Sequence, residues 1–178
     1  MKFRSAIQLL AVGVVALVVA DASADYKKSG TSSVSFHANG SAGMKIDGKT
    51  SDLEFTDGKV VRVKVPLANL DTGMALRNKH MKEKYLEVDK YPNAELAVPK
   101  DQLKIPSNGM QKANGTFTMH GVTKGKSFSY KVEKDGDGYK VEGWFSINIT
   151  EHGIAEPGYL GVKVKPDVDV DVSFHVKE

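Results

Sequence analysis

The sequence predicts an all-β, antiparallel domain of about eight strands, arranged as a sandwich or a closed barrel. Three observations favour this class. Apolar and polar residues alternate over most of the chain after Ser33, which is typical of strands with one buried face. Aspartate–glycine pairs, which favour tight turns, recur between the alternating segments. One short segment has the composition of a helix.

The first 24 residues have the composition of a cleaved signal peptide. Lys2 and Arg4 provide a positive start, residues 7–20 are an apolar run of about 14 residues, and Ala22-Ser23-Ala24 offers the small side chains that a signal peptidase needs. A membrane-spanning helix needs roughly 20 apolar residues, so an anchor is disfavoured. We expect cleavage after Ala24, a periplasmic or secreted protein, and one domain over residues 25–178.

The expected mature domain is nearly neutral and contains no cysteine. It keeps 154 of the 178 residues, which allows a single domain with a sizeable core. Without Lys2, Arg4 and Asp21 it carries 23 basic and 21 acidic side chains, a net charge of +2. No basic run interleaved with aromatic residues is present, so we expect no nucleic-acid partner. Without disulfides, the core must stabilise the fold.

The clearest strand is predicted near the carboxyl end, where alternation continues over about fifteen residues. Seven apolar side chains share its buried face: Val162, Val164, Val168, Val170, Val172, Phe174 and Val176. Pro166 lacks a backbone N–H, so it should lie at a strand edge or a bulge. The same alternation occurs in residues 60–65, 117–119, 128–132 and 139–149.

Turns are expected where aspartate precedes glycine. Residues 134–138 read Lys-Asp-Gly-Asp-Gly, which predicts a tight hairpin. The segment lacks the further oxygen ligands and the glutamate of a calcium loop. Asp47-Gly48 and Asp57-Gly58 are predicted turns for the same reason. Residues 150–161 contain three glycines and a proline and are predicted to form a long loop.

Residues 74–85 interrupt the alternation and predict a short helix, because they lack β-branched side chains and are rich in good helix formers. Asp71 or Thr72 would cap its N-terminus. One face of the helix is formed by Met74, Arg77, Met81 and Tyr85. Since the rest of the helix is polar, we expect it to bury this apolar stripe at a wall or mouth of the domain.

No catalytic or metal-binding constellation is evident. The five histidines include no His-Glu-x-x-His sequence and no pair at helical metal spacing. No Gly-x-Ser-x-Gly motif or cysteine nucleophile occurs, and Glu151-His152 has the pattern of an ordinary polar turn. We therefore expect no catalytic residue, no metal and no resident cofactor.

Two other functions remain open on the residues alone. A metal-assisted hydrolase would use scattered histidines, such as His80 and His120, brought together by the fold. The second alternative concerns the interior of the barrel. An eight-stranded barrel can be wide enough for one small ligand, or its interior can be filled by side chains. A filled barrel would act through protein–protein contact.

Short motifs follow one another in a recognisable order. They are Ser33-Val34-Ser35-Phe36, Leu70-Asp71-Thr72-Gly73, Arg77-Asn78-Lys79-His80-Met81, Tyr91-Pro92, the run Thr116 to Lys124, and Phe145-Ser146-Ile147-Asn148 followed by Gly153-Ile154. Together they resemble the motifs of the YceI-like family of secreted bacterial proteins, over nearly the whole mature chain. The chain departs from the family pattern at His152, where an aromatic residue is usual, and at Ile149-Thr150, where an arginine is usual.

The resemblance implies an eight-stranded antiparallel lipocalin-like barrel with one short helix and a long loop. It also implies a non-enzymatic periplasmic carrier whose partner is an isoprenoid or similar amphiphilic lipid, such as a quinone or a polyprenyl compound. We expect that lipid to be bound as a ligand, with transient contact to the membrane surface. The oligomeric state, monomer or dimer, is left open.

The alternation phase and the helix predict which side chains would line a lipid-binding cavity. They are Phe36, Met74, Leu76, Met81, Tyr85, Phe117, Met119, Phe128, Tyr130, Phe145 and Ile147. A head group would need hydrogen-bond donors at the rim of the barrel. The nearest candidates are Arg77, His80, His120 and Lys124.

Overall fold

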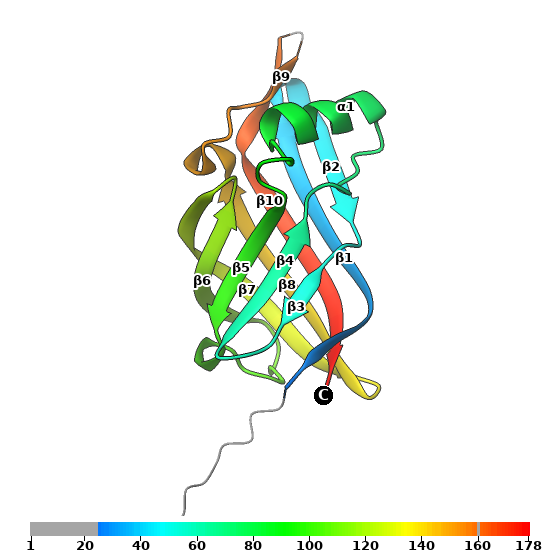
Figure 1. Cartoon of the computed structure of the whole chain (residues 1–178), viewed down its shortest axis with the longest axis vertical. Helices are drawn as coiled ribbons and strands as arrows, with labels where there is room; N and C mark the ends of the chain where they lie inside the picture. Colours follow the sequence, from blue (N-terminus) through cyan, green and yellow to red (C-terminus); the bar gives the residue numbers. More distant parts are fainter. Residues whose placement is uncertain (1–24, 160) are drawn as a thin grey trace, which may run out of the picture.

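The computed structural model of the chain describes residues 25–159 and 161–178. The predicted signal peptide, residues 1–24, lies outside the described residues. A tall, strongly curled antiparallel sheet carries a helical segment across one end, and the carboxyl terminus lies at the other (Figure 1). The predicted all-β class is confirmed. Within the described residues, no helix is long and apolar enough to cross a membrane.

The described residues form ten strands rather than the eight predicted. Nine are neighbours in the order β2-β1-β10-β8-β7-β6-β5-β4-β3, and β9 pairs with β10. Their bounds are β1 Lys27–Gly40, β2 Lys45–Thr50, β3 Glu54–Thr56, β4 Val60–Pro66, β5 Asn93–Pro99, β6 Gln111–Met119, β7 Val122–Asp135, β8 Gly138–Asn148, β9 Gly158–Tyr159 and β10 Val162–Lys177. The count differs because β3 and β9 have only three and two residues, too few to show alternation.

The predicted helix is present as α1 (Ala75–Lys79), continued by the π-helical segment η2 (His80–Tyr85). Below we call the two together the mouth helix. The predicted capping is wrong: Met74 occupies the N-cap position without a side-chain hydrogen bond. Short 3₁₀ turns complete the helical elements: η1 Ser41–Gly43, η3 Lys100–Gln102 and η4 Ile149–His152. The predicted long loop therefore contains η4 and strand β9.

Strand β10 shows the predicted alternation and the predicted irregularity at Pro166. Its pairing with β1 runs from Lys177 to Val164 and shifts register between Val168 and Val164. Pro166 lies within that shift, and the pairing of β10 with β8 begins only at Asp167. The missing N–H therefore falls outside the regular ladders, as expected for a proline at a bulge.

One of the three predicted turns is wrong. Asp47-Gly48 lies inside β2, where Gly48 pairs with Phe36 of β1. A Cβ at Gly48 would lie 2.3 Å from Cε1 of Phe36, so the glycine makes room for the ring. The chain turns earlier, at η1. The turn at Asp57-Gly58 is confirmed between β3 and β4, as is the hairpin at residues 136–137 between β7 and β8.

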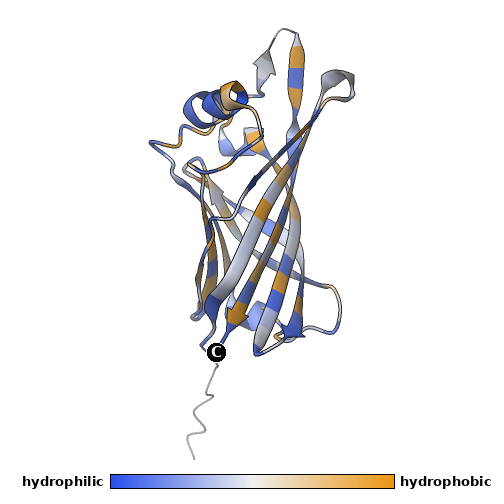
Figure 2. Ribbon diagram, turned by 90° about the vertical axis from the view of Figure 1, so that its right-hand side faces the viewer, coloured by the Kyte–Doolittle hydropathy of each residue, from blue (hydrophilic) through white to orange (hydrophobic). Residues whose placement is uncertain are grey.

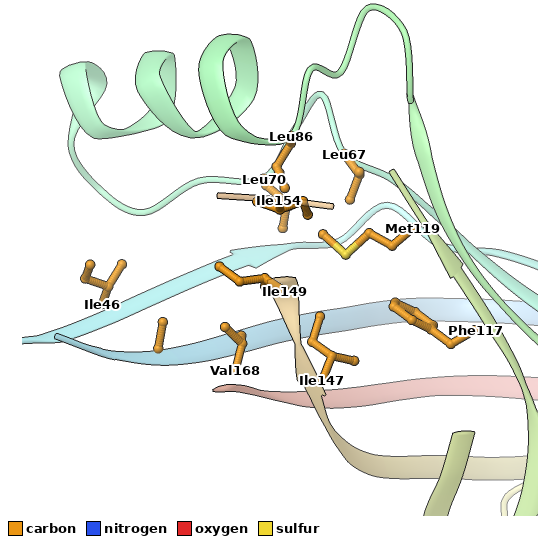
Figure 3. Close-up of a cluster of buried hydrophobic side chains, with 11 residues drawn as sticks. Ile46, Leu67, Leu70, Leu86, Phe117, Met119, Ile147, Ile149, Ile154 and Val168 are labelled. Carbon is orange, nitrogen blue, oxygen red and sulfur yellow. The ribbon is translucent and has the colours of Figure 1, made fainter. Parts of the chain in front are cut away.

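Apolar and polar residues alternate along the strands of the curled sheet (Figure 2). The two edge strands of the sheet are β2 and β3. The sheet curls far enough to bring β1 against β3. Towards the mouth helix, Lys49 of β2 exchanges two backbone hydrogen bonds of 2.9 Å with Asp71. A cluster of buried side chains gathers beneath that helix (Figure 3): Ile46, Leu67, Leu70, Leu86, Phe117, Met119, Ile147, Ile149, Ile154 and Val168.

Candidate functional site

The inside of the curled sheet is not filled by side chains. It encloses a cavity of about 660 Å³ whose wall is formed mainly by the inward-facing apolar residues of the strands. The wall extends from Met81 of the mouth helix to Tyr26 and Val176 at the opposite end of the sheet. This volume lies in the range of small-molecule binding sites. The structure thus favours the open alternative of the two interiors that the sequence allowed.

The structure brings together all eleven side chains predicted to line a binding cavity. They are Phe36, Met74, Leu76, Met81, Tyr85, Phe117, Met119, Phe128, Tyr130, Phe145 and Ile147. Phe117 and Phe145 meet edge to face across the wall, with ring centroids 5.3 Å apart. The inward direction of these residues follows from the pleat of the strands. Their contact with a ligand remains a prediction.

The mouth helix lies over one end of the cavity without being buried (Figure 1). Met74 and Leu76 each expose 57% of their surface, whereas Arg77, Met81 and Tyr85 are half-buried, so the stripe is buried only in part. All four residues of the stripe line the cavity, and Met81 and Tyr85 also pack against the buried cluster beneath the helix. The helix is anchored by the buried Leu86, just beyond its end, and by the Tyr85 hydroxyl, which accepts a hydrogen bond of 3.2 Å from Gly158 N.

Polar groups at this mouth are few and are held in place. Arg77 and His80 line the cavity there, together with Thr72. Arg77 donates through Nε to the Thr72 hydroxyl at 2.8 Å and through Nη2 to the Thr72 carbonyl. Asn78 accepts from Thr72 N and Oγ1 at 2.8 and 2.7 Å. The guanidinium of Arg77 is therefore fixed at the rim of an apolar cavity.

Asp71 completes this arrangement. Its carboxylate accepts hydrogen bonds from the Asn78 amide at 2.7 Å and from Gly73 N at 2.8 Å. These bonds, the one from Asn78 first, hold the pKa of the Asp71 carboxyl below its ordinary value. The segment before the mouth helix is thus ordered by side-chain bonds instead of by a helix cap, which explains why the predicted cap is absent.

The other two head-group candidates lie away from the cavity. Lys124 is exposed on β7 and does not line the cavity; the β7 residues that do are Phe128, Tyr130 and Val132. His120 instead joins two loops: Nε2 lies 2.7 Å from Glu87 Oε2, and Nδ1 lies 3.2 Å from the carbonyl oxygen of His152. We therefore do not retain these two as candidates for a head-group site.

The residues around His120 form a structural cluster that the sequence did not reveal. The Tyr91 ring lies against His120, with centroids 4.3 Å apart, and a Cβ at Gly121 would lie 2.8 Å from Tyr91 Cε1. His152, 1% exposed, places Nδ1 3.0 Å from the Val122 carbonyl oxygen. Three of the short motifs thus meet here; their Tyr91, His120 and His152 side chains hold loops together and do not line the cavity.

The remaining histidines do not converge on a metal site. His37 is exposed between Asp47 and Asp171, at 2.7 and 2.8 Å, and the hydrogen bond to Asp47 is the main reason that the pKa of His37 is raised. His175 pairs with Asp135 at 2.9 Å. Within residues 25–159 and 161–178, no group of three His, Cys, Asp or Glu residues could hold a metal ion. The described part of the chain thus offers no ligand set for the hydrolase alternative.

The family model for the YceI-like domain matches residues 26–176. The chain belongs to the YceI-like family. No curated protein matches it.

Several solved structures share the YceI-like fold at 16% sequence identity. A polyisoprenoid-binding domain from Saccharophagus degradans, implicated in plant cell wall breakdown, superposes with a TM-score of 0.70, over 85% of this chain and 97% of that one. BcnA of Burkholderia cenocepacia gives 0.66, over 83% and 96%. The YceI protein of Campylobacter jejuni gives 0.54, over 100% and 99%. These likenesses establish the shared fold.

Proposed function

We propose that this YceI-like protein is a non-enzymatic carrier of an isoprenoid or similar amphiphilic lipid, such as a quinone or a polyprenyl compound, in the periplasm. The observation that carries the proposal is the apolar cavity of about 660 Å³ with polar side chains fixed at the end beneath the mouth helix. The similar structure described as a polyisoprenoid-binding domain supports the class of ligand. The signal-like residues 1–24 support export.

The energetics of such a cavity favour long chains. Each buried methylene contributes about 0.8 kcal/mol, so ten of them contribute about 8 kcal/mol. Association costs at least about 4 kcal/mol, which leaves only modest affinity for a chain of that length. Longer chains bury more surface and bind more tightly. The head group needs only orientation, which Arg77 supplies by donating hydrogen bonds to an anionic or carbonyl oxygen.

Native mass spectrometry tests the proposal most directly. Protein purified from the periplasm of a bacterial host should retain a lipid, or take up added quinones or polyprenols as one molecule per chain. Repeated recovery of an empty protein that takes up neither class would overturn the proposed function.

Met81→Lys tests the mouth of the cavity. Met81 is half-buried on the mouth helix and lines the cavity, so a lysine there places a long side chain with a terminal charge at the entrance. Because the ammonium can still reach water, we expect polyprenol affinity to fall by about tenfold or more, with the melting temperature changed little. Fluorescent-lipid displacement and thermal unfolding measure the two effects.

Lys82→Met is the matched control, since Lys82 is the next residue and does not line the cavity. It should leave uptake unchanged. If Met81→Lys unfolds the protein while binding per folded molecule stays the same, the mouth helix merely plugs the sheet and the assignment of the mouth is wrong.

Contact with the membrane surface is part of the proposed carrier role. Met74 and Leu76 are exposed at the cavity mouth, and Lys79, Lys82 and Lys84 follow them on the same helix. Apolar side chains flanked by lysines suit the interface of an anionic bilayer. We expect Met74→Ser combined with Leu76→Ser to weaken binding to phosphatidylglycerol-containing vesicles by about tenfold or more, because each buried apolar side chain contributes about 1.5–3 kcal/mol.

Vesicle co-sedimentation measures this difference. The control is Met110→Ser, because Met110 is 64% exposed but lies far from the mouth helix. It precedes β6, and the opposite end of that strand, Met119, lies in the cluster beneath the mouth helix. An equal loss of vesicle binding in the control, or no loss in the double variant, would show that the mouth helix does not contact the membrane.

A further inference from the structure

The end of the cavity opposite the mouth helix contains a buried charge. We call it the far end; Tyr26, Asp57 and Leu103 line the cavity there. Asp57 follows β3 in the turn to β4, and Tyr26 precedes β1. Lys100 begins η3, directly after β5. The sheet thus brings together three segments that are far apart in the sequence.

The contacts of Asp57 are uneven. Its side chain is 1% exposed. Oδ2 accepts hydrogen bonds from Tyr26 N at 2.8 Å and from Lys100 Nζ at 2.9 Å. Oδ1 is buried and has no hydrogen-bond partner among the described residues. One oxygen of this carboxylate is therefore satisfied by the protein, and the other is not.

An unsatisfied buried acceptor is costly, because it loses its hydrogen bonds to water and gains none in return. Buried polar groups in native proteins almost always have a partner, either in the protein or in an ordered water molecule. Asp57 lines a cavity whose wall is otherwise almost entirely apolar. Oδ1 itself is covered in this conformation, so a rotation of the Asp57 side chain must bring it to the cavity before a molecule there can supply the missing donor.

We propose that the far end of the cavity is a subsite for a hydroxyl group, or a similar neutral hydrogen-bond donor, at the distal end of the bound chain. This inference rests on the proposed function, since it assumes a chain that enters from the mouth. Oδ1 of Asp57 accepts the hydrogen bond. The ligand is then polar at both ends: an oxygen-bearing head at Arg77 and a hydroxyl at Asp57.

The charges at the far end select a neutral donor. The Lys100 ammonium already compensates the Asp57 carboxylate at 2.9 Å, so a cationic ligand group would be placed close to a like charge. An anionic group would be repelled by the carboxylate itself. A hydroxyl donates to Oδ1 without adding charge, and a hydrogen bond to a charged acceptor is worth more than one between neutral groups.

Saturated fatty acids and their ω-hydroxy counterparts, from dodecanoic to docosanoic acid, test the subsite. The acid group favours the Arg77 end, so the ω-hydroxyl is carried towards Asp57. Titration calorimetry should show that the hydroxyl weakens binding of short chains, which leave it in apolar surroundings. At the length that spans the cavity, it should strengthen binding by about tenfold, the effect of a hydrogen bond to a charged group.

Variants at the far end make the test specific. In Asp57→Ala, the gain from the hydroxyl should disappear while the parent acid still binds within about twofold of the original protein. Asp57→Asn keeps the shape but not the charge, and should retain only part of the gain. It also serves if the alanine variant fails to fold. Asp101→Ala removes an exposed carboxylate that does not line the cavity, and should keep the full gain.

The outcomes separate the two proposals. If the parent acids bind but the hydroxyl gives no gain at any length, the subsite is wrong, and a water molecule satisfies Oδ1. A gain that persists in both Asp57 variants also overturns it. If no acid binds to the original protein at any length, the proposed function fails together with the subsite.

Discussion

Ala94→Trp is expected to weaken the binding of long-chain amphiphiles by roughly a hundredfold while the fold stays intact. Ala94 lies on β5, lines the cavity, and packs against the cluster beneath the mouth helix. An indole there occupies space that the chain would otherwise fill. Excluding about four methylenes removes about 3 kcal/mol, which corresponds to roughly a hundredfold loss of affinity. Lipid displacement measures the loss, and thermal unfolding should show an unchanged or raised melting temperature.

Ala97→Trp is the matched control on the same strand. Ala97 has the opposite alternation phase, is opposite Arg62 and Thr116 in the ladders, and does not line the cavity. Its indole should leave lipid uptake unchanged. Equal losses in the two variants would show that binding does not depend on the cavity. Full uptake by Ala94→Trp would exclude this part of the cavity from the site.

His152→Ala is expected to destabilise the protein by about 3–5 kcal/mol, the range for removing a large buried ring. His152 is almost fully buried, and its ring lies edge-on to Phe117 with centroids 5.5 Å apart. Its Nδ1 lies 3.0 Å from the Val122 carbonyl oxygen, so truncation also removes a hydrogen bond from this backbone group. Urea unfolding at neutral pH measures the change in the free energy of unfolding.

Two further variants separate the causes. His152→Phe keeps an aromatic ring, which the family pattern usually has at this position, and loses the hydrogen bond. It should cost about 1–2 kcal/mol. His175→Ala removes an exposed ion pair with Asp135 and should cost less than about 1 kcal/mol. A cost for His152→Ala no greater than that of His175→Ala would contradict a structural role for the buried ring.

Much of the cavity wall could be predicted from the sequence, because side-chain direction in a strand is a local property. Successive residues point to opposite faces of a strand. Phe117 and Met119 therefore share one face, as do Phe145 and Ile147, and their apolar character already indicates that this face points inwards. A second local property, the backbone N–H that proline lacks, predicted the bulge at Pro166. The turn predicted from the Asp-Gly pair at Asp47-Gly48 is absent, because that glycine makes room for the neighbouring Phe36 ring.

Contacts between distant segments required the tertiary structure. His120 meets Glu87 across 33 positions, which removes it from the rim, and Asp57 meets Lys100 across 43. The sequence predicted only a turn at Asp57 and gave no sign of its buried, half-satisfied carboxylate. Nor could alternation show that the interior remains hollow, since filling depends on how far the sheet curls. The sequence by itself thus determined the strands that are long enough to alternate, the helix and the inward-facing residues, because these follow from local backbone geometry. The cavity volume, the cluster around His152 and the polar far end depend on strand register and sheet curvature, which arise only when the whole chain packs.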